Sequence, residues 1–458
     1  MAEHEVELVV VGAGPGGEVL ATGAANAGLE VVVVERHLVG GECPYYGCVP
    51  TKMMVRGSDV VAEVRRAAAV AGEAAITPAW SVVARRIDEQ ATSGWDDTIA
   101  VERLQDAGAT VLHGVARLAG TGRVTVAVDG GEQVTYTARR GVVLNPGTRP
   151  ALPPVDGLAE TPYWTNRDAV RLTELPGSLV VVGGGPIGCE LAQVFARFGV
   201  RVSVVQQGDR LLPAHEPDAS ALLEDVFVDE GIRVLTGVEL QRASYADGAF
   251  ALTLDSGEEL VADKVLVAAG RTPNLDDLGL ETVGLDPRAR TIEVDERLRA
   301  GERLWTIGDV TGKGAFTHVA MYQSAIALRD ILDEDGPPAS YHALPHVTFT
   351  DPEVGGVGLT EQRARDAGLR VRTGLTGLEG SSRGFMHGAG GHGLIKVVED
   401  ADRGVLVGAT AMGPAGGEIL GFLAVAVHAE VPVASLRTMI YAYPTFHRAI
   451  EAALSDLS

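Results

Sequence analysis

Two copies of one strand–turn–helix–strand unit constrain the fold more than any other feature of this sequence. The first copy spans Glu7–Glu35 and the second spans Leu179–Gln206. In each copy an apolar strand enters a glycine-rich turn, a helix follows, and a second apolar strand ends in a polar residue. Strands that alternate with helices in this way pair in parallel. We therefore expect an α/β protein that contains two Rossmann-like dinucleotide-binding domains.

The first turn runs from Gly12 to Gly17 and reads GAGPGG. Gly12 makes the tight turn, Gly14 lets the backbone approach a pyrophosphate, and Gly17 lets helix and strand pack closely. The start of a helix favours an anion, so the pyrophosphate is expected there. Glu35 ends the next strand, where a carboxylate accepts hydrogen bonds from a ribose diol.

The second turn contains Gly183, Gly185 and Gly188 at equivalent positions, and its second strand ends in Gln206. A neutral amide can bond a ribose hydroxyl without repelling a 2′-phosphate, and the nearest arginine is Arg210. The sequence therefore leaves NADH and NADPH both open. Two sites predict two cofactors, one retained and one exchanged, although one site could be vestigial.

At 458 residues the chain is too long for one hydrophobic core. A proline-rich stretch at 146–154 suggests a linker, and antiparallel patterns such as HVTFT and GVLVGATAM follow Pro337 and Pro338. We predict a discontinuous first domain at 1–150 and 271–334, a second domain at 151–270, and a third, α+β domain at 335–458.

Charge and hydropathy exclude several classes of partner. The net charge is −23 with no basic stripe, which argues against nucleic acid. No apolar run approaches the roughly 18 to 20 residues of a membrane-spanning helix, and the N-terminal apolar run is a strand rather than a signal peptide. We expect a cytoplasmic protein that acts on a small molecule, with no membrane partner and no resident metal.

Two of the three cysteines lie close together in the run GGECPYYGCVPTKMM. Cys43 and Cys48 can approach within the roughly 7 Å between Cα atoms that a disulfide needs. Amides at the start of a helix favour the reactive thiolate. A zinc site would need further ligands at short spacing, and none follow. The alternative is a pair of reduced core thiols; Cys189, in an apolar stretch, is interpreted as a packing residue.

The run GGxC-x4-C-V-P-T-K resembles the active-site segment of the pyridine nucleotide–disulfide oxidoreductases, the family of dihydrolipoamide dehydrogenase, glutathione reductase and mercuric reductase. The resemblance extends along the whole chain. Further matching segments are WTNRDA, AAGRTPN, TIGDVTG, THVAMYQ and PHVTFTDPEVGGVGLTE. It implies FAD and NADH or NADPH as cofactors, and an obligate homodimer whose third domain forms the interface and completes the partner's active site.

The resemblance also implies roles for individual residues. Cys48 would contact the flavin, Cys43 would be the interchange thiol, and Lys52 would lie near the flavin in a pair with Glu190. Asp309 would bond FAD and Gly114 would abut its adenine. Other motif positions are expected at the cofactors, namely Arg36, Gly41, Gly147, Gly270, Arg271, His318 and Ala320. Electrons would pass from nicotinamide through flavin to the cysteine pair and on to an acceptor.

The C-terminal segment departs from the family pattern HPTxxE. Tyr443 replaces the histidine and Arg448 replaces the glutamate that orients it. A phenol is a poor base near neutral pH but can donate a hydrogen bond. His447 could substitute as a base, although we favour a structural role for it. Mercury reduction is disfavoured because the C-terminal cysteine pair and N-terminal metal-binding extension of mercuric reductases are not seen.

Other departures lie beside the cysteines. Glu42 replaces a threonine before Cys43, which would raise the pKa of the thiol or supply a local base. Tyr45 and Tyr46 either pack in the core or bind a flat substrate, and Pro186 replaces an aromatic gate. We expect a disulfide or another small oxidised compound as acceptor. The alternatives are a diaphorase-like reductase of quinones or metal ions, and a redox-sensing flavoprotein.

Overall fold

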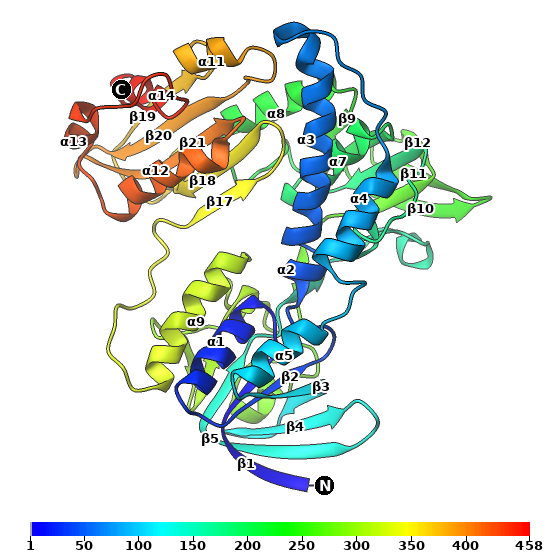
Figure 1. The fold of residues 1–458 in the computed structure, drawn as a ribbon, viewed down its shortest axis with the longest axis vertical. Helices are drawn as coiled ribbons and strands as arrows, with labels where there is room; N and C mark the ends of the chain where they lie inside the picture. The colour runs from blue at the N-terminus through cyan, green and yellow to red at the C-terminus, as the bar shows by residue number, and fades with distance from the viewer. Residues whose placement is uncertain (1) are drawn as a thin grey trace. The chain divides into compact units, whose positions relative to one another are not determined.

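The computed structural model describes residues 2–458 (Figure 1). Contacts divide the chain into two compact units. Unit 1 comprises Met1–Pro50, Arg85–Ala151 and Arg271–Ser340, and unit 2 comprises Thr51–Ala84, Leu152–Gly270 and Tyr341–Ser458. The long helix α3 (Cys48–Val70) begins in unit 1 and continues in unit 2. The predicted three-domain boundaries divide the chain more finely and stay a prediction.

Unit 1 is built on a seven-stranded sheet. Strands β2, β1, β5 and β16 pair in parallel in that order, β3 pairs in parallel with β2, and β4 runs antiparallel between β3 and β5. The strands are β1 (Ala2–Val11), β2 (Val31–Glu35), β3 (Thr110–Leu118), β4 (Arg123–Val128), β5 (Gln133–Leu144), β15 (Arg299–Gly301) and β16 (Leu304–Thr306), with a separate pair β6 (Thr148–Pro150) and β14 (Arg271–Pro273).

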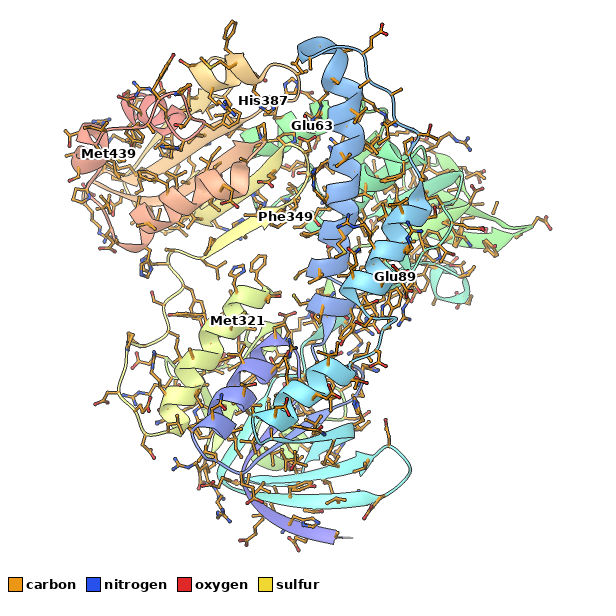
Figure 2. The ribbon with its side chains drawn as sticks, in the orientation of Figure 1. Glu63, Glu89, Met321, Phe349, His387 and Met439 are labelled. Atoms are coloured by element: carbon orange, nitrogen blue, oxygen red, sulfur yellow. The ribbon has the colours of Figure 1, made fainter. Side chains whose placement is uncertain are left out.

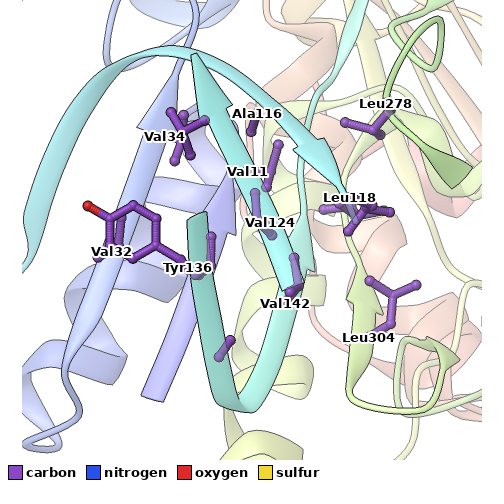
Figure 3. Packing of buried hydrophobic residues seen from close by; sticks show 14 of the residues in the cluster. Val11, Val32, Val34, Ala116, Leu118, Val124, Tyr136, Val142, Leu278 and Leu304 are labelled. Carbon is purple, nitrogen blue, oxygen red and sulfur yellow. The ribbon is translucent and has the colours of Figure 1, made fainter. Parts of the chain in front are cut away.

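The alternation of side chains along β1 explains why this sheet is buried on both faces. Leu8 and Val10 pack into a core with helix residues such as Leu20. Val9 and Val11 belong to a second core on the other face, which Figure 3 shows with Val11 labelled. Continuous apolar strands of this kind are typical of parallel sheets covered on both sides. The helices of unit 1 are α1 (Pro15–Asn26), α2 (Glu42–Tyr45), α5 (Thr98–Asp106) and α9 (Thr317–Ile331), and α1 lies against α9 (Figure 1).

Unit 2 contains the second strand–turn–helix–strand unit. Its four-stranded parallel sheet has the order β13-β7-β8-β9. The strands are β7 (Ser178–Val182), β8 (Arg201–Gln206), β9 (Arg233–Thr236) and β13 (Lys264–Val267), and an antiparallel sheet is formed by β10 (Leu240–Ala246), β11 (Ala249–Leu254) and β12 (Glu259–Ala262). The accompanying helices are α4 (Trp80–Arg86), α6 (Asn166–Ala169), α7 (Pro186–Arg197) and α8 (Pro217–Asp229).

The C-terminal part of unit 2 is an antiparallel five-stranded sheet with helix α12 lying on it (Figure 1). Its strands are β17 (Pro345–Thr348), β18 (Glu353–Gly358), β19 (Val371–Gly377), β20 (Leu394–Asp400) and β21 (Val405–Gly413). Its helices are α10 (Glu361–Asp366), α11 (Ser382–His387), α12 (Gly416–His428), α13 (Val433–Thr438) and α14 (Ala449–Ser455). The strands expected from HVTFT and GVLVGATAM are confirmed. Within residues 2–458, no helix is both long and apolar enough to cross a membrane.

Candidate functional site

The first glycine turn has the geometry of a pyrophosphate cradle. Gly12 adopts φ +94°, and a Cβ there would lie 2.2 Å from the Asn145 carbonyl oxygen. A Cβ on Gly17 would lie 2.1 Å from the Gly12 oxygen, so only glycine fits either position. Gly14 is the N-cap of α1, and no side chain in residues 2–458 caps that helix. The first amides of α1 are therefore available to an anion, which fits a dinucleotide.

The polar residues that end the second strands hold the two turns in the same way. The Ala13 amide donates to Glu35 Oε2 at 2.8 Å, and the Gly184 amide donates to Gln206 Oε1 at 2.8 Å. Glu35 Oε1 also accepts from the His37 amide at 2.8 Å, which fixes the carboxylate at the end of β2. Because a backbone N–H must donate to oxygen, the Gln206 side chain is oriented with its NH2 group as the remaining donor.

The second turn repeats the close approaches of the first. Gly183 adopts φ +112°, with a Cβ position 2.4 Å from the Ala268 oxygen, and a Cβ on Gly188 would lie 1.9 Å from the Gly183 oxygen. Nothing lies within 4 Å of a Cβ at Gly185, the N-cap of α7. The turn therefore leaves space where a second pyrophosphate would approach the helix.

Three of the residues expected at the cofactors are Gly41, Gly114 and Arg36. Gly41 approaches Gly14, since its Cβ would lie 2.9 Å from the Gly14 Cα. Gly114 permits the close pairing of β3 and β4, because a Cβ would lie 2.5 Å from the Ala127 oxygen. Arg36 is exposed at the end of β2. These placements give Gly114 a structural reason, and its predicted contact with adenine stays a prediction.

The start of α9 also reaches the first turn. Ala320 lies against Gly16, whose Cβ would be 3.1 Å from the Ala320 Cβ. Ser324 Oγ donates to the Gly16 oxygen at 2.7 Å. His318 stacks on Phe316 with ring centroids 5.2 Å apart. The segment that begins at Phe316 is therefore held beside the helix that the first turn opens.

Asp309 is tied to the segment before Cys43 by a chain of side chains. Thr148 Oγ1 donates to Asp309 Oδ2 at 2.6 Å. Arg271 donates through Nε to Thr148 Oγ1 at 2.6 Å and through Nη2 to the Thr148 carbonyl at 2.8 Å. The same guanidinium forms an ion pair with Glu42 at 3.4 Å. The Glu42 carboxylate, which was expected to act on the neighbouring Cys43 thiol, is therefore also paired with Arg271.

Gly147 and Gly270 immediately precede Thr148 and Arg271 in the chain. Both glycines have positive φ, +64° and +113°, and nothing lies within 4 Å of a Cβ at either position. Their predicted role at the cofactors stays a prediction.

The two cysteines lie at the starts of consecutive helices. Cys43 belongs to α2 and is half-buried, whereas Cys48 is exposed and is the first residue of α3. The Cys48 Sγ lies 3.4 Å from the hydroxyl of Thr317, the first residue of α9. Helix-terminal amides and a hydroxyl donor both stabilise a thiolate.

The two tyrosines between the cysteines are core residues. Tyr45 is 5% exposed and Tyr46 is 9% exposed. The Tyr45 hydroxyl donates to the Asp96 carbonyl at 3.4 Å, and burial raises the pKa of Tyr45 to about 12. This supports the packing interpretation over a contact with substrate. Cys189 is fully buried, and burial raises the pKa of its thiol, in keeping with a packing residue.

The expected pair of Lys52 and Glu190 is present in unit 2. Lys52 Nζ donates to Glu190 Oε2 at 2.7 Å, and Glu190 is only 5% exposed. Glu190 Oε1 accepts from the Phe349 amide at 2.9 Å, and the Lys52 ammonium lies 4.7 Å from the Phe349 ring. Phe349 directly follows β17 and is labelled in Figure 2. A buried carboxylate is stable when it is paired and hydrogen-bonded in this way.

The C-terminal segment places a cation, not a carboxylate, beside Tyr443. Tyr443 is 65% exposed, and the Arg448 guanidinium lies 5.7 Å from its ring. Arg448 is in turn paired with Glu451 at 3.1 Å. His447 lies with its ring 6.3 Å from that of Tyr441, and none of residues 2–458 supplies it with a carboxylate partner. This favours the structural role of His447.

Sequence reasoning missed several side chains that contact predicted site residues, among them Thr148 between Arg271 and Asp309. Thr317 was overlooked although it begins the quoted run THVAMYQ. Phe349 lies in the quoted run PHVTFTDPE, but an aromatic residue in a strand gives no signal of a contact with a lysine. Glu451 is three residues beyond the expected position of an orienting glutamate, so an insertion-tolerant search of the last helix could have found it.

Comparisons with known proteins identify the family. The model of the pyridine nucleotide-disulphide oxidoreductases matches residues 6–324, and the model of their dimerisation domain matches residues 344–454. A dihydrolipoyl dehydrogenase of Halobacterium salinarum is 35% identical over 465 residues, covering 98% of this chain and 95% of the relative. A mercuric reductase of Streptomyces lividans is 33% identical over 461 residues, with the same shares of 98% and 95%.

Solved structures agree. LpdA from Mycobacterium tuberculosis has a TM-score of 0.87 at 26% identity and covers 98% of this chain and 99% of its own. The flavoprotein disulfide reductase RclA from Escherichia coli has a TM-score of 0.85 at 25% identity, with the same shares of 98% and 99%. The predicted fold class, cofactors and enzyme class are confirmed, and the dimerisation domain supports the homodimer. The chain belongs to the pyridine nucleotide–disulphide oxidoreductases, a family of enzymes that depend on FAD and use NAD(P)H.

Proposed function

We propose that this enzyme passes electrons from NAD(P)H to Cys43 and Cys48 and then to a disulfide or another small oxidised acceptor. The observation that carries the proposal is the setting of Cys48, which opens α3, is exposed and contacts the Thr317 hydroxyl. A thiol in such a setting is reactive because its thiolate is stabilised. FAD, when bound, accepts a hydride from the nicotinamide and delivers two electrons to a disulfide.

Residues of this chain would bind the two dinucleotides and carry out the thiol–disulfide exchange. The amides of α1 and the Glu35 carboxylate hold one dinucleotide, and the turn before α7 holds the other. Reduction of the Cys43–Cys48 disulfide yields two thiols. The Cys43 thiolate then attacks an acceptor disulfide and releases one thiol, and the Cys48 thiolate displaces the second thiol while the internal disulfide forms again.

Lys52 and Glu190 would supply a fixed charge pair on the helix that follows Cys48. Lys52 is four residues after Cys48 in α3, so both side chains start from the same face of that helix. Glu190 holds the ammonium in place and Phe349 covers it. Tyr443 would donate a proton to the departing thiolate across the homodimer interface, because a phenol donates more readily than it abstracts.

A second candidate is the direct reduction of metal ions or quinones. Relatives named mercuric reductase, one of them 33% identical, favour a metal-ion acceptor. The absence of the family histidine at Tyr443 also favours an acceptor other than dihydrolipoamide.

A screen of acceptors with NADH and NADPH tests both candidates. Disulfides, quinones and metal ions are offered to the wild type, Cys43→Ser and Cys189→Ala, the last being a control for loss of a buried thiol. We expect Cys43→Ser to abolish disulfide reduction and to spare quinone reduction. Equal loss of both activities would refute the separate role of Cys43. Reduction by about two electrons should also give a charge-transfer band in the wild type. Persistence of that band in Cys48→Ser would refute the thiolate assignment.

A further inference from the structure

Four side chains of unit 1 form a continuous chain from the residue before Cys43 to the predicted flavin ligand Asp309. They come from four separate elements: Glu42 begins α2, Arg271 begins β14, Thr148 begins β6, and Asp309 follows Gly308. The four contacts measure 3.4, 2.6, 2.8 and 2.6 Å in that order along the chain. The pairing of β6 with β14 brings Thr148 and Arg271 together.

The direction of every hydrogen bond in this chain is fixed by chemistry. A guanidinium has only donors, so Arg271 Nε must donate to the Thr148 hydroxyl oxygen. The single hydroxyl hydrogen of Thr148 is therefore free to point at Asp309 Oδ2, which must accept it. Asp309 is thus held as an acceptor in one orientation. This state depends on Arg271 remaining in place.

Glu42 is the carboxylate that balances Arg271 within residues 2–458. The side chains of Arg271 and Glu42 are 21% and 26% exposed, and Thr148 is 8% exposed. A partly buried guanidinium loses hydration, so a paired carboxylate stabilises its position. The two bonds from Arg271 to Thr148 add a fork that a lysine could not reproduce.

We propose that Glu42 is a positioning residue, which acts through Arg271 and Thr148 to hold Asp309 in the orientation that binds FAD. It also ties α2, the helix that carries Cys43, to that site. On this proposal Glu42 acts through Arg271 and not as a base for the neighbouring thiol. The inference rests on the proposed role of Asp309 and does not depend on which acceptor the enzyme reduces.

The test is a double-mutant cycle on the affinity of the apoprotein for FAD, measured by quenching of flavin fluorescence. We expect Glu42→Gln and Thr148→Val each to weaken binding by roughly tenfold, since each removes a bond that involves or supports a charged group. Because Glu42 and Thr148 act through the same series of contacts, the FAD affinity of the double variant should fall by much less than the product of the two single effects. Thr148→Ser keeps the hydroxyl and should restore the affinity.

Glu281→Gln is the matched control, because Glu281 and Arg117 form an exposed pair at 2.7 Å in the same unit without a link to Asp309. It should leave FAD affinity unchanged. Full independence of Glu42→Gln and Thr148→Val would overturn the proposal. So would unchanged FAD affinity in Glu42→Gln together with a shift of about one pH unit in alkylation of Cys43, measured in a Cys48→Ser background. Unchanged affinity in Asp309→Asn would instead refute the role of Asp309 itself.

Discussion

Arg197 lies at the centre of the ion network that anchors α3, the helix that begins at Cys48. Its guanidinium is 2% exposed and contacts Glu230 at 2.6 Å, Asp351 at 2.7 Å and Asp59 at 3.0 Å. Arg66, which like Asp59 lies on α3, contacts Asp351 at 2.7 Å. The two arginines thus share the carboxylate of Asp351. Replacing Arg197 by methionine removes the cation shared by all three and keeps an unbranched side chain in the core.

The expected cost is that of breaking a buried ion pair from one side, about 3 to 5 kcal/mol near pH 8. Asp59, Glu230 and Asp351 are only 34%, 20% and 15% exposed, and Arg66 would remain as a partner of Glu230 and Asp351. This corresponds to a fall in Tm of roughly 5 to 9 °C if unit 2 unfolds as one transition, and roughly 3 to 5 °C if the whole chain does. Arg197→Lys keeps the charge and loses the fork, so its loss should be intermediate.

The stability lost in Arg197→Met should depend on pH, and Asp59 and Asp351 set the direction of that dependence. Burial raises the pKa of Asp59 to about 6, so the folded state gains relative stability from this group as pH falls through 6. Burial opposes ionisation of Asp351, but Arg197 and Arg66 hold its pKa below the usual value. Its stabilisation is therefore present above the unfolded pKa and is lost only in acid.

Without Arg197 the pKa values of Asp59 and Asp351 rise, so the variant should regain stability as these two carboxylates take up protons. Thermal unfolding of the FAD-loaded proteins near pH 8 and near pH 5.5 tests this. The gap between wild type and Arg197→Met should be clearly smaller at the lower pH. An equal gap at both pH values, or a loss below about 1 kcal/mol near pH 8, would refute the reasoning.

Two further variants examine cofactor choice and the redox thiol. Gln206→Glu keeps an acceptor for the Gly184 amide and adds a negative charge, so the ratio of kcat/KM for NADPH to that for NADH should fall at least roughly tenfold; an unchanged ratio would show that Gln206 does not face the 2′-position. Thr317→Val removes the hydroxyl beside the Cys48 sulfur, so alkylation of Cys48 should require a higher pH, while Thr317→Ser should behave as the wild type. If the pH dependence of Cys48 alkylation is the same in the valine and serine variants, the Thr317 hydroxyl does not stabilise the Cys48 thiolate.

The sequence predicted the parts of the site that are local in the chain. Gly12 and Gly183 signal their turns because the backbone there admits no Cβ, and the spacing to Glu35 and Gln206 follows from the length of one helix and one strand. The parallel sheet follows from the same units. Lys52 and Glu190 were paired in advance only through the family resemblance, since 138 residues separate them.

Contacts made by tertiary pairing could not be predicted in this way. The contact of Arg271 with Thr148 depends on the pairing of β6 with β14, which no periodicity in either short strand announces, and the ion pair of Glu42 with Arg271 joins residues far apart in the sequence. Glu42 was therefore interpreted from its neighbour in sequence, Cys43, and its partner in space was missed. The choice between packing and binding for Tyr45 and Tyr46 needed their burial, which the sequence between two cysteines does not reveal.

The C-terminal segment bears on whether the enzyme reduces an acceptor or oxidises a dithiol. Oxidation of a dithiol requires a base to take its protons, whereas reduction of an acceptor releases a thiolate that requires a proton donor. Glu451 orients Arg448, and Arg448 faces the ring of Tyr443, so the carboxylate acts on a cation and not on a base. The Arg448 cation over the Tyr443 ring holds that ring in position, and it does not turn the Tyr443 hydroxyl into a proton acceptor. The proposed role of Tyr443 as a proton donor therefore fits reduction of an acceptor, whereas oxidation of a dithiol would require a base in its place.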